Sequence, residues 1–403
     1  MVICRGIIYH KIIEELSNLL KSLFINLDDK KEIKKFENKF KKFNKSKYCM
    51  SYPFARSALM SILKTEANIK PGDEIIISSI QIKGMLDVIK NLRLNPIIVD
   101  ISPETLNFDL NDLKKKINKK TKLILLTYLY GIVPDVYKIL KIIKKKKIIL
   151  VEDFSQCLGG KYNSKIVGNF GNYGIYSLSA TKTLDTYGGG ILVTNDKKSY
   201  LKNLSYNNSL SKTSRRFLIY KIFLSLIKNI FSKKPLFYIV ILIFKLFNLI
   251  GYDGYSKFIG SRKTKLLNKI PKIWETKFTS LQAKYGSYLI RNVKKENKLR
   301  IKNVNLIKKI INKNYFPIDL KKSYNVYWQL ALNTKNPNFV RKEALKNNID
   351  IATPSIQLLS KVISNTKIKK SIEIYKNLLL LPSYHTLNND EINEIGKKIK
   401  KYV

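Results

Sequence analysis

Cysteine and histidine are scarce in this chain of 403 residues, which contains three cysteines and two histidines. Cys4, Cys49 and Cys157 form neither a pairing framework nor a metal-ligand spacing, so we expect a reducing, cytoplasmic compartment. With only His10 and His385 available, most histidine-built metal sites are excluded, and we predict no metal site.

Acidic residues are also few, 29 against 76 lysines and arginines, which gives a formal charge of +47. Such a charge is typical of proteins that bind nucleic acids or anionic membranes. However, the excess is nearly all lysine spread along the chain, arginine is rare, and no arginine-rich arm or RNP signature is present. Codon bias of an AT-rich genome and solvated protein faces explain this composition, so we predict no nucleic-acid partner.

Apolar residues make up 45% of the chain, an ordinary share for a globular protein, and the length suffices for two domains. Residues 8–24 resemble an amphipathic helix and not a secretory signal, because acidic residues interrupt their apolar pattern. Helical spacing also covers 30–44 and 280–305. Between these, short apolar runs alternate with helical stretches, which predicts a mainly parallel sheet covered by helices; the runs are 74–77, 96–99, 123–126, 147–151 and 191–194.

Three segments contain groups that suit a pyridine cofactor. Residues 151–157 read as a strand that ends in a carboxylate, residues 177–182 carry a hydroxyl and a lysine, and residues 188–190 are three glycines. Such a cofactor needs an acid for its ring nitrogen, a hydroxyl for its phosphate and an amine that bonds to its aldehyde.

The order and spacing of these segments resemble the DegT/DnrJ/EryC1/StrS family of pyridoxal-phosphate sugar aminotransferases, from about residue 32 to the C-terminus apart from one insertion. The resemblance implies an α/β fold like that of aspartate aminotransferase, with a large, mainly parallel seven-stranded sheet domain and a smaller α+β C-terminal domain. We therefore expect N-terminal helices (1–44) that pack on the small domain, a large domain (45–265) and a small domain (274–403). The insertion covers about 203–273.

The resemblance assigns the central roles to three residues. Lys182 would bond to the cofactor and, once displaced, move a proton between the substrate carbon and the cofactor. Asp153 would pair with the pyridine nitrogen, although an aspartate after a strand is also a common helix N-cap. Gln156 matches the family residue that donates a hydrogen bond to the phenolic oxygen of the cofactor.

The phosphate requires amides at a helix start together with hydroxyl groups. Ser177 matches the phosphate hydroxyl of the family, and its alternative is an ordinary loop serine. Ala55 and Arg56 occupy the place of the usual Gly-Thr pair, so their backbone amides would bind the phosphate. The guanidinium of Arg56 would either replace the lost hydroxyl contact or only cap the surface.

Other positions depart from the family pattern. Ile82 stands where the family has an aromatic ring over the cofactor, and Tyr128 begins the segment that matches a histidine motif. Glu275 aligns with an asparagine that the neighbouring subunit usually donates to the phosphate. Tyr128 and His385 are candidate substrate contacts, while a structural histidine is at least as good an interpretation of His385.

The insertion is apolar and basic. A helical projection of 217–231 groups the few polar residues on one stripe, and the uncharged run 236–244 is far shorter than the ~20 residues that span a bilayer. Residues 217–250 would therefore contact a membrane surface peripherally or form a helical hairpin buried at a dimer interface or over the site. The second alternative is slightly favoured.

The overall prediction is a pyridoxal 5'-phosphate-dependent transaminase of amino-sugar and surface-glycan biosynthesis. It would act on a nucleotide-linked keto-sugar with glutamate as amino donor and 2-oxoglutarate as the product of that donor, in a homodimer. Dehydratases of the family carry histidine in place of the lysine, so Lys182 argues against that branch. The alternative is a non-catalytic relative that serves as a membrane-associated or regulatory partner in a glycan-biosynthesis cluster.

Overall fold

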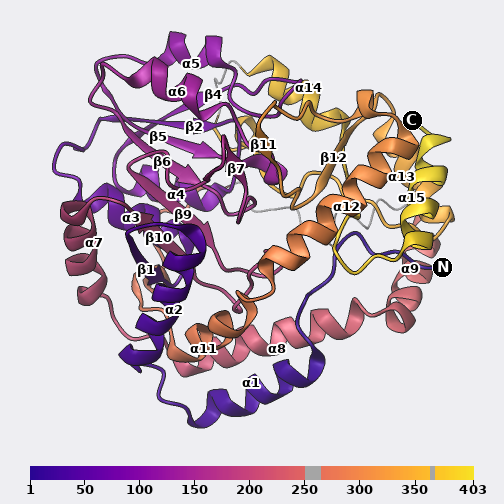
Figure 1. Cartoon of the computed structure of the whole chain (residues 1–403), viewed down its shortest axis with the longest axis horizontal. Helices are drawn as coiled ribbons and strands as arrows, with labels where there is room; N and C mark the ends of the chain where they lie inside the picture. Colours follow the sequence, from indigo (N-terminus) through magenta and orange to yellow (C-terminus); the bar gives the residue numbers. More distant parts are fainter. Residues whose placement is uncertain (250–264, 364–367) are drawn as a thin grey trace.

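A seven-stranded sheet forms the centre of the computed structural model, which describes residues 1–249, 265–363 and 368–403 (Figure 1). Its order is β1-β10-β9-β6-β5-β2-β4, and β10 alone runs antiparallel to its two neighbours. The predicted strand runs are confirmed within a few residues. The strands are β1 (Tyr48–Tyr52), β2 (Glu74–Ser78), β4 (Asn95–Val99), β5 (Thr121–Thr127), β6 (Ile149–Asp153), β9 (Tyr173–Ser177) and β10 (Gly190–Thr194).

Helices cover both faces of this sheet, because its strands are apolar on both sides. In β2, Ile75 and Ile77 point to one apolar cluster while Ile76 points to the other. The first cluster includes α3 (Ala55–Thr65) and α4 (Lys83–Asn91), with α7 (Lys197–Ser209) at its edge. The second includes α2 (Lys30–Asn44), α5 (Leu110–Lys116) and α6 (Val136–Ile143). The mainly parallel α/β class is thus confirmed.

The C-terminal part forms a separate apolar cluster around the two-stranded sheet β12 (Leu330–Asn333) and β14 (Leu378–Leu381). Residue Ile3 joins this cluster, so the first residues of the chain pack on its last third. The helices of this part are α12 (Val293–Ile311), α13 (Pro337–Lys346), α14 (Lys369–Asn377) and α15 (Asn389–Lys400). Short strands complete the fold: β3 (Ile80–Gln81), β7 (Lys161–Tyr162), β8 (Lys165–Ile166), β11 (Ser323–Tyr324) and β13 (Gln357–Leu358).

Two helices replace the single one predicted over 280–305. α11 (Ser280–Leu289) ends where the Ile290 N–H bonds to the Gly286 carbonyl and the Asn292 N–H to the Leu289 carbonyl, which tightens the last turn. α2 packs on α11 and on β1, while α1 (Ile12–Phe24) packs mainly on the insertion. The domain boundaries drawn from the sequence stay a prediction.

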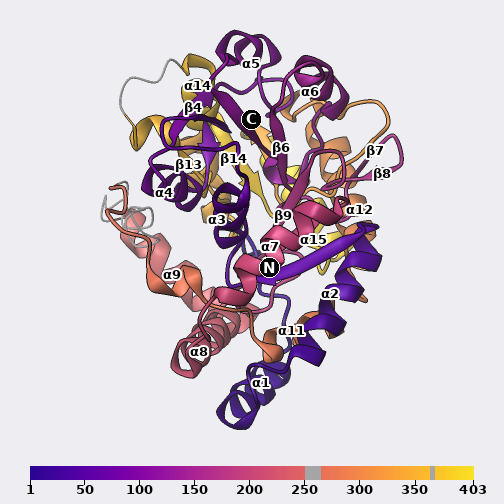
Figure 2. The same cartoon turned by 90° about the vertical axis from the view of Figure 1, so that its left-hand side faces the viewer.

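The insertion forms α8 (Arg215–Phe231) and α9 (Lys234–Leu249), which lie along one side of the molecule in Figure 2. Residues 250–264 of the predicted insertion fall outside the described residues. Neither these helices nor any other described helix is long and apolar enough to cross a membrane.

Candidate active site

Asp153 and Lys182 lie near each other at the carboxyl edge of the large sheet. Asp153 ends β6, and Lys182 belongs to the loop between β9 and β10, residues 178–189, called the lysine loop below. Burial lowers the pKa of Lys182 to about 8, against the opposing charge of Asp153. Burial likewise raises the pKa of Asp153, although hydrogen bonds from Ser155 and the charge of Lys182 act in the opposite direction. A carboxylate and an amine of reduced basicity therefore share one buried site.

Trp328 forms a wall of this site that sequence reasoning missed. The Lys182 Nζ lies 3.8 Å from the centroid of the Trp328 ring, and the indole Nε1 donates to the Thr181 carbonyl at 2.7 Å. The Tyr327 N–H donates to the Gly131 carbonyl. Position 131 requires glycine, because its φ is +84° and a Cβ there would lie 2.5 Å from the Trp328 nitrogen. The only signal in the sequence was that the chain has just two tryptophans.

Gln156 supports the same turn. Its Oε1 accepts the Tyr130 N–H at 2.7 Å, which fixes both the side chain and the segment that holds Trp328. In the described part of the chain no hydrogen bond joins the Gln156 Nε2 to another residue, so this amide can donate to a bound group.

The start of α3 lies against the end of β10 and offers amides for a phosphate. Gly190 is the register partner of Ser177, and a Cβ on Gly190 would lie 2.4 Å from the Ala55 nitrogen. No described residue accepts a hydrogen bond from the Ala55 or Arg56 N–H, as expected in the first turn of a helix. The Ser177 Oγ lies 2.9 Å from the Ser179 Oγ. Two hydroxyls and two amides thus come from adjacent elements.

The Arg56 side chain packs between aromatic rings. Its guanidinium carbon lies 4.6 Å from the ring centroid of Trp274 and 5.1 Å from that of Phe54. Burial lowers the pKa of Arg56, with Asp87 opposing. The guanidinium is thus stacked on aromatic rings and is not a simple surface cap, while its contact with a phosphate stays a prediction.

Ile82 lies beside the strand ends, half-buried against the first apolar cluster. Its N–H donates to the Gln81 Oε1, and the Gln81 Nε2 donates to the Thr127 Oγ1. Since Thr127 is the register partner of Asp153, this chain of bonds places Ile82 at the edge that carries the site.

The Tyr128 side chain points away from this edge, and His385 lines a different cavity. The Tyr128 hydroxyl donates to the Glu152 Oε2 at 2.5 Å inside the second apolar cluster, on the opposite side of the sheet from Asp153. His385 packs on Tyr9, with ring centroids 4.8 Å apart, and lines a smaller cavity of about 330 Å³. Burial lowers the pKa of His385 to about 4.

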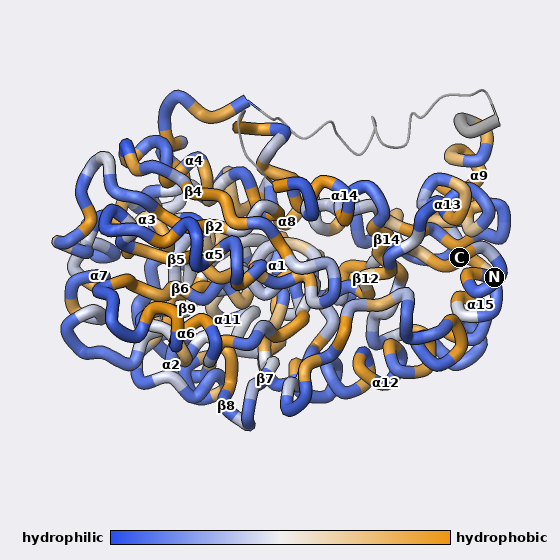
Figure 3. Tube along the Cα trace, turned by 90° about the horizontal axis from the view of Figure 1, so that it is seen from above, coloured by the Kyte–Doolittle hydropathy of each residue, from blue (hydrophilic) through white to orange (hydrophobic). Residues whose placement is uncertain are grey.

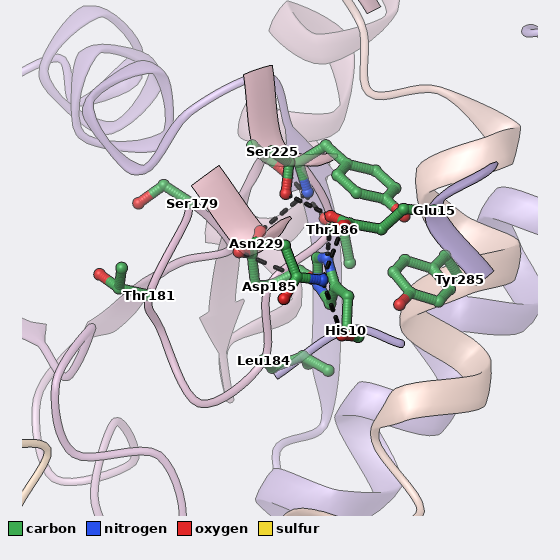
Figure 4. A network of polar contacts seen from close by, with 12 residues as sticks. His10, Glu15, Ser179, Thr181, Leu184, Asp185, Thr186, Ser225, Asn229 and Tyr285 are labelled. Atoms are coloured by element: carbon green, nitrogen blue, oxygen red, sulfur yellow. Dashed lines mark hydrogen bonds and ion pairs between the residues drawn. The ribbon is translucent and has the colours of Figure 1, made fainter. Parts of the chain in front are cut away.

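A buried polar network ties the lysine loop to the N-terminus and the insertion, and Figure 4 shows it. The His10 Nδ1 lies 3.0 Å from the Glu15 Oε1, and its Nε2 lies 3.0 Å from the Asp185 carbonyl. Ser225 and Asn229 of α8 donate to the two oxygens of Glu15 at 2.6 and 2.7 Å. Sequence reasoning missed this network because its members are up to 219 positions apart.

Comparison with known proteins agrees with this geometry. The sequence profile of the DegT/DnrJ/EryC1/StrS aminotransferase family matches residues 7–219, which is more than half of the chain. The chain belongs to this family.

Among curated members, GDP-perosamine synthase of Escherichia coli O157:H7 is 35% identical over 174 residues, 43% of this chain and 48% of that protein. The pleiotropic regulatory protein of Geobacillus stearothermophilus is 33% identical over 165 residues, 41% of this chain and 44% of the relative. The chain thus matches less than half the length of either relative. The putative sugar aminotransferase Spr1654 from Streptococcus pneumoniae, solved in its PLP form, shares the fold with a TM-score of 0.76 at 16% identity; the match covers 100% of this chain and 98% of that one.

The site of this DegT/DnrJ/EryC1/StrS family chain fits pyridoxal phosphate. Lys182 is a buried amine without a hydrogen bond to the described residues, and Asp153 is a buried carboxylate close to it. The Gln156 Nε2 donates to no described residue, and the start of α3 presents the N–H groups of Ala55 and Arg56 beside Ser177. A cofactor with a pyridine ring at one end and a phosphate at the other would use all of these groups.

A cavity of about 1070 Å³ begins at Thr181 and Trp328 and extends between the N-terminal segment, α8 and the C-terminal part. None of the described residues that line it is acidic, whereas five are basic: Arg5, Lys228, Arg341, Lys361 and Lys376. Arg5 is paired with Asp350 at 2.5 Å, whereas Lys228, Lys361 and Lys376 form no ion pair with any described residue and give the cavity a positive charge.

Proposed function

We propose that the chain catalyses the pyridoxal-phosphate-dependent transamination of a nucleotide-linked keto-sugar, with glutamate as amino donor. The observation that carries this proposal is the buried pair of Lys182 and Asp153 beside the start of α3. The names of relatives support the sugar class, since GDP-perosamine synthase and several sugar aminotransferases are among them.

When bound, pyridoxal phosphate supplies an electrophilic carbon and an electron-accepting ring. Asp153 would hold the proton on the ring nitrogen, and the Gln156 Nε2 would donate to the ring oxygen. The amides of Ala55 and Arg56 and the Ser177 hydroxyl would bind the phosphate. The Lys182 amine, with a pKa of about 8, would take the proton from the substrate carbon and deliver it to the cofactor.

The basic cavity next to Trp328 supports an anionic substrate. A nucleotide diphosphate and the two carboxylates of glutamate would both gain from the charges of Lys228, Lys361 and Lys376. GDP-4-keto-6-deoxy-D-mannose 3-dehydratase of Yersinia pseudotuberculosis is also a relative, 31% identical over 173 residues. Lys182 favours amination over that dehydration, because the dehydratases of the family carry histidine in place of this lysine, whose amine can bond to the cofactor and move a proton.

A non-catalytic role is the second candidate, because one relative is named a pleiotropic regulatory protein. It is also motivated by Ala55 and Arg56, which stand in place of the usual Gly-Thr pair of the family.

A visible absorption spectrum of the purified protein, before and after glutamate, separates the two candidates. The aminotransferase predicts a cofactor band that is absent from Lys182→Ala and that glutamate bleaches. Lys284→Ala, a lysine of α11, serves as the matched control and should keep the band. Absence of a band after addition of the cofactor would rule out the aminotransferase function. A band that glutamate leaves unchanged would rule out glutamate as the amino donor.

A further inference from the structure

The outward face of α9 is apolar from Leu236 to Leu246. Its exposed side chains recur at helical spacing and are 37–60% exposed, whereas Phe237 and Ile241 on the opposite side are buried against Cys4. Figure 3 shows this helix at the upper right as a hydrophobic segment. The exposed residues are Leu236, Tyr238, Ile239, Leu242, Ile243 and Leu246.

α8 adds a second apolar stripe next to it. Tyr220, Phe223 and Phe231 lie 48–55% exposed on one side of α8, while Leu218 and Ile222 are buried on the other. The two helices contact each other, and Figure 2 places both along the same side of the molecule. We call these exposed residues of α8 and α9 the docking face.

The charged residues of the segment that forms the docking face are all basic. Residues 215–249 contain seven lysines and arginines and no aspartate or glutamate. Three of the seven bond to their own chain, since Lys234 pairs with Glu391, Lys245 bonds to Asn348, and Arg215 donates to the Ser22 carbonyl. Lys228 lines the cavity described above, whereas Arg216 and Lys233 form no ion pair with any described residue. The positive charge beside the face therefore remains available to an anionic partner.

A comparison with α1 separates two kinds of exposed apolar surface. α1 also exposes apolar residues, among them Leu20 at 64% and Leu23 at 47%. Residues 11–24, however, carry two lysines and two glutamates, so their net charge is zero. The apolar surface of α1 thus lacks the excess of cations that the docking face has.

We propose that the docking face binds the surface of an anionic lipid bilayer. An apolar helix face bordered by lysines and arginines is the feature of helices that lie in the membrane interface. The sixteen residues of α9 extend about 24 Å, which is less than the roughly 30 Å hydrocarbon core, so the helix would lie on the membrane and not cross it. The proposal does not depend on the proposed enzymatic function.

Vesicle flotation of the full-length protein tests this proposal. We expect binding to phosphatidylglycerol-containing vesicles at least tenfold stronger than to pure phosphatidylcholine vesicles, because each cation near an anionic surface contributes about 1 kcal/mol. Ile239→Glu/Leu242→Glu should weaken binding at least tenfold. The matched control Leu20→Glu/Leu23→Glu makes the same change at the same spacing on α1 and should leave binding unchanged.

Circular dichroism and sedimentation of each variant complete the test. The proposal is supported if both double variants are folded with unchanged mass, and only Ile239→Glu/Leu242→Glu binds the vesicles more weakly. Absence of binding by the natural sequence, or equal weakening by both double variants, would overturn the proposal. A loss of dimer mass in Ile239→Glu/Leu242→Glu with vesicle binding intact would instead make this face a contact between two copies of the chain.

Discussion

Lys182 experiences two opposing influences on its amine. Burial lowers the pKa of Lys182 to about 8, and the Asp153 charge works against this effect. The indole of Trp328 stabilises the charged form as well, because a cation 3.8 Å from a ring centroid is attracted to the ring. The reactivity of the amine therefore depends on a residue 146 positions away in the sequence.

Substitution of Trp328 by leucine should lower the pKa of Lys182 further. A cation–π contact is worth roughly 0.5–2 kcal/mol, so we expect the midpoint to fall by about 0.4–1.5 pH units. Competitive acetylation of the cofactor-free protein, read out for the Lys182 peptide by mass spectrometry against pH, measures the midpoint. Trp274→Leu is the matched control and should leave the midpoint unchanged; a midpoint that both variants shift equally would contradict the role of Trp328.

At the scale of elements, the His10 network joins the segment before α1, the helix α8 and the lysine loop. Burial would lower the pKa of His10, but the carboxylates of Asp185 and Glu15 outweigh it and raise this pKa. Burial would raise the pKa of Glu15, but hydrogen bonds from His10, Ser225 and Asn229 outweigh it and lower this pKa.

The sign of the pH dependence follows from these directions. A raised histidine pKa adds stability below about pH 6.5, and this stability is lost as the pH rises through the folded-state value. His10→Gln should therefore lose less free energy of unfolding than the natural sequence between pH 6 and pH 9. Urea unfolding at both pH values measures the difference, and an equal loss in both proteins would show that His10 is not charged in the folded state.

Ser225→Ala tests the contribution of the α8 hydrogen bonds to the same network at neutral pH. It removes one donor from the buried Glu15 and should cost about 1–3 kcal/mol of unfolding free energy. Ser209→Ala, which removes an exposed hydroxyl bonded to the Tyr206 carbonyl, is the control and should cost less than about 0.5 kcal/mol.

At the scale of the whole molecule, the charge of +47 acts against the folded state. Like charges repel more strongly in the compact chain than in the unfolded one, and salt screens this repulsion. We expect the melting temperature to rise between 20 and about 300 mM sodium chloride, as measured by differential scanning calorimetry. Potassium chloride should act alike, since the effect depends on ionic strength. A melting temperature that falls with salt would show that ion pairs such as Lys83 with Asp87 outweigh the repulsion.

The sequence by itself determined the α/β class and the segments that carry the chemistry. Asp153 and Lys182 belong to strand ends and loops with local signals, and parallel strands necessarily bring their carboxyl ends to one edge. The apolar pattern of α8 and α9 was equally local, because helical spacing is visible within a few turns.

Only the tertiary structure decided which way the other candidates point. Tyr128 follows the same strand edge, yet its hydroxyl bonds to Glu152 on the far side of the sheet. His385 lies in a neighbouring cavity, and Trp328 lies over Lys182 because the turn at Tyr130 and Gly131 accepts hydrogen bonds from the N–H groups of Tyr327 and Gln329 on either side of it. These placements, like the His10 network, depend on contacts between distant segments, and no local pattern of residues encodes such contacts.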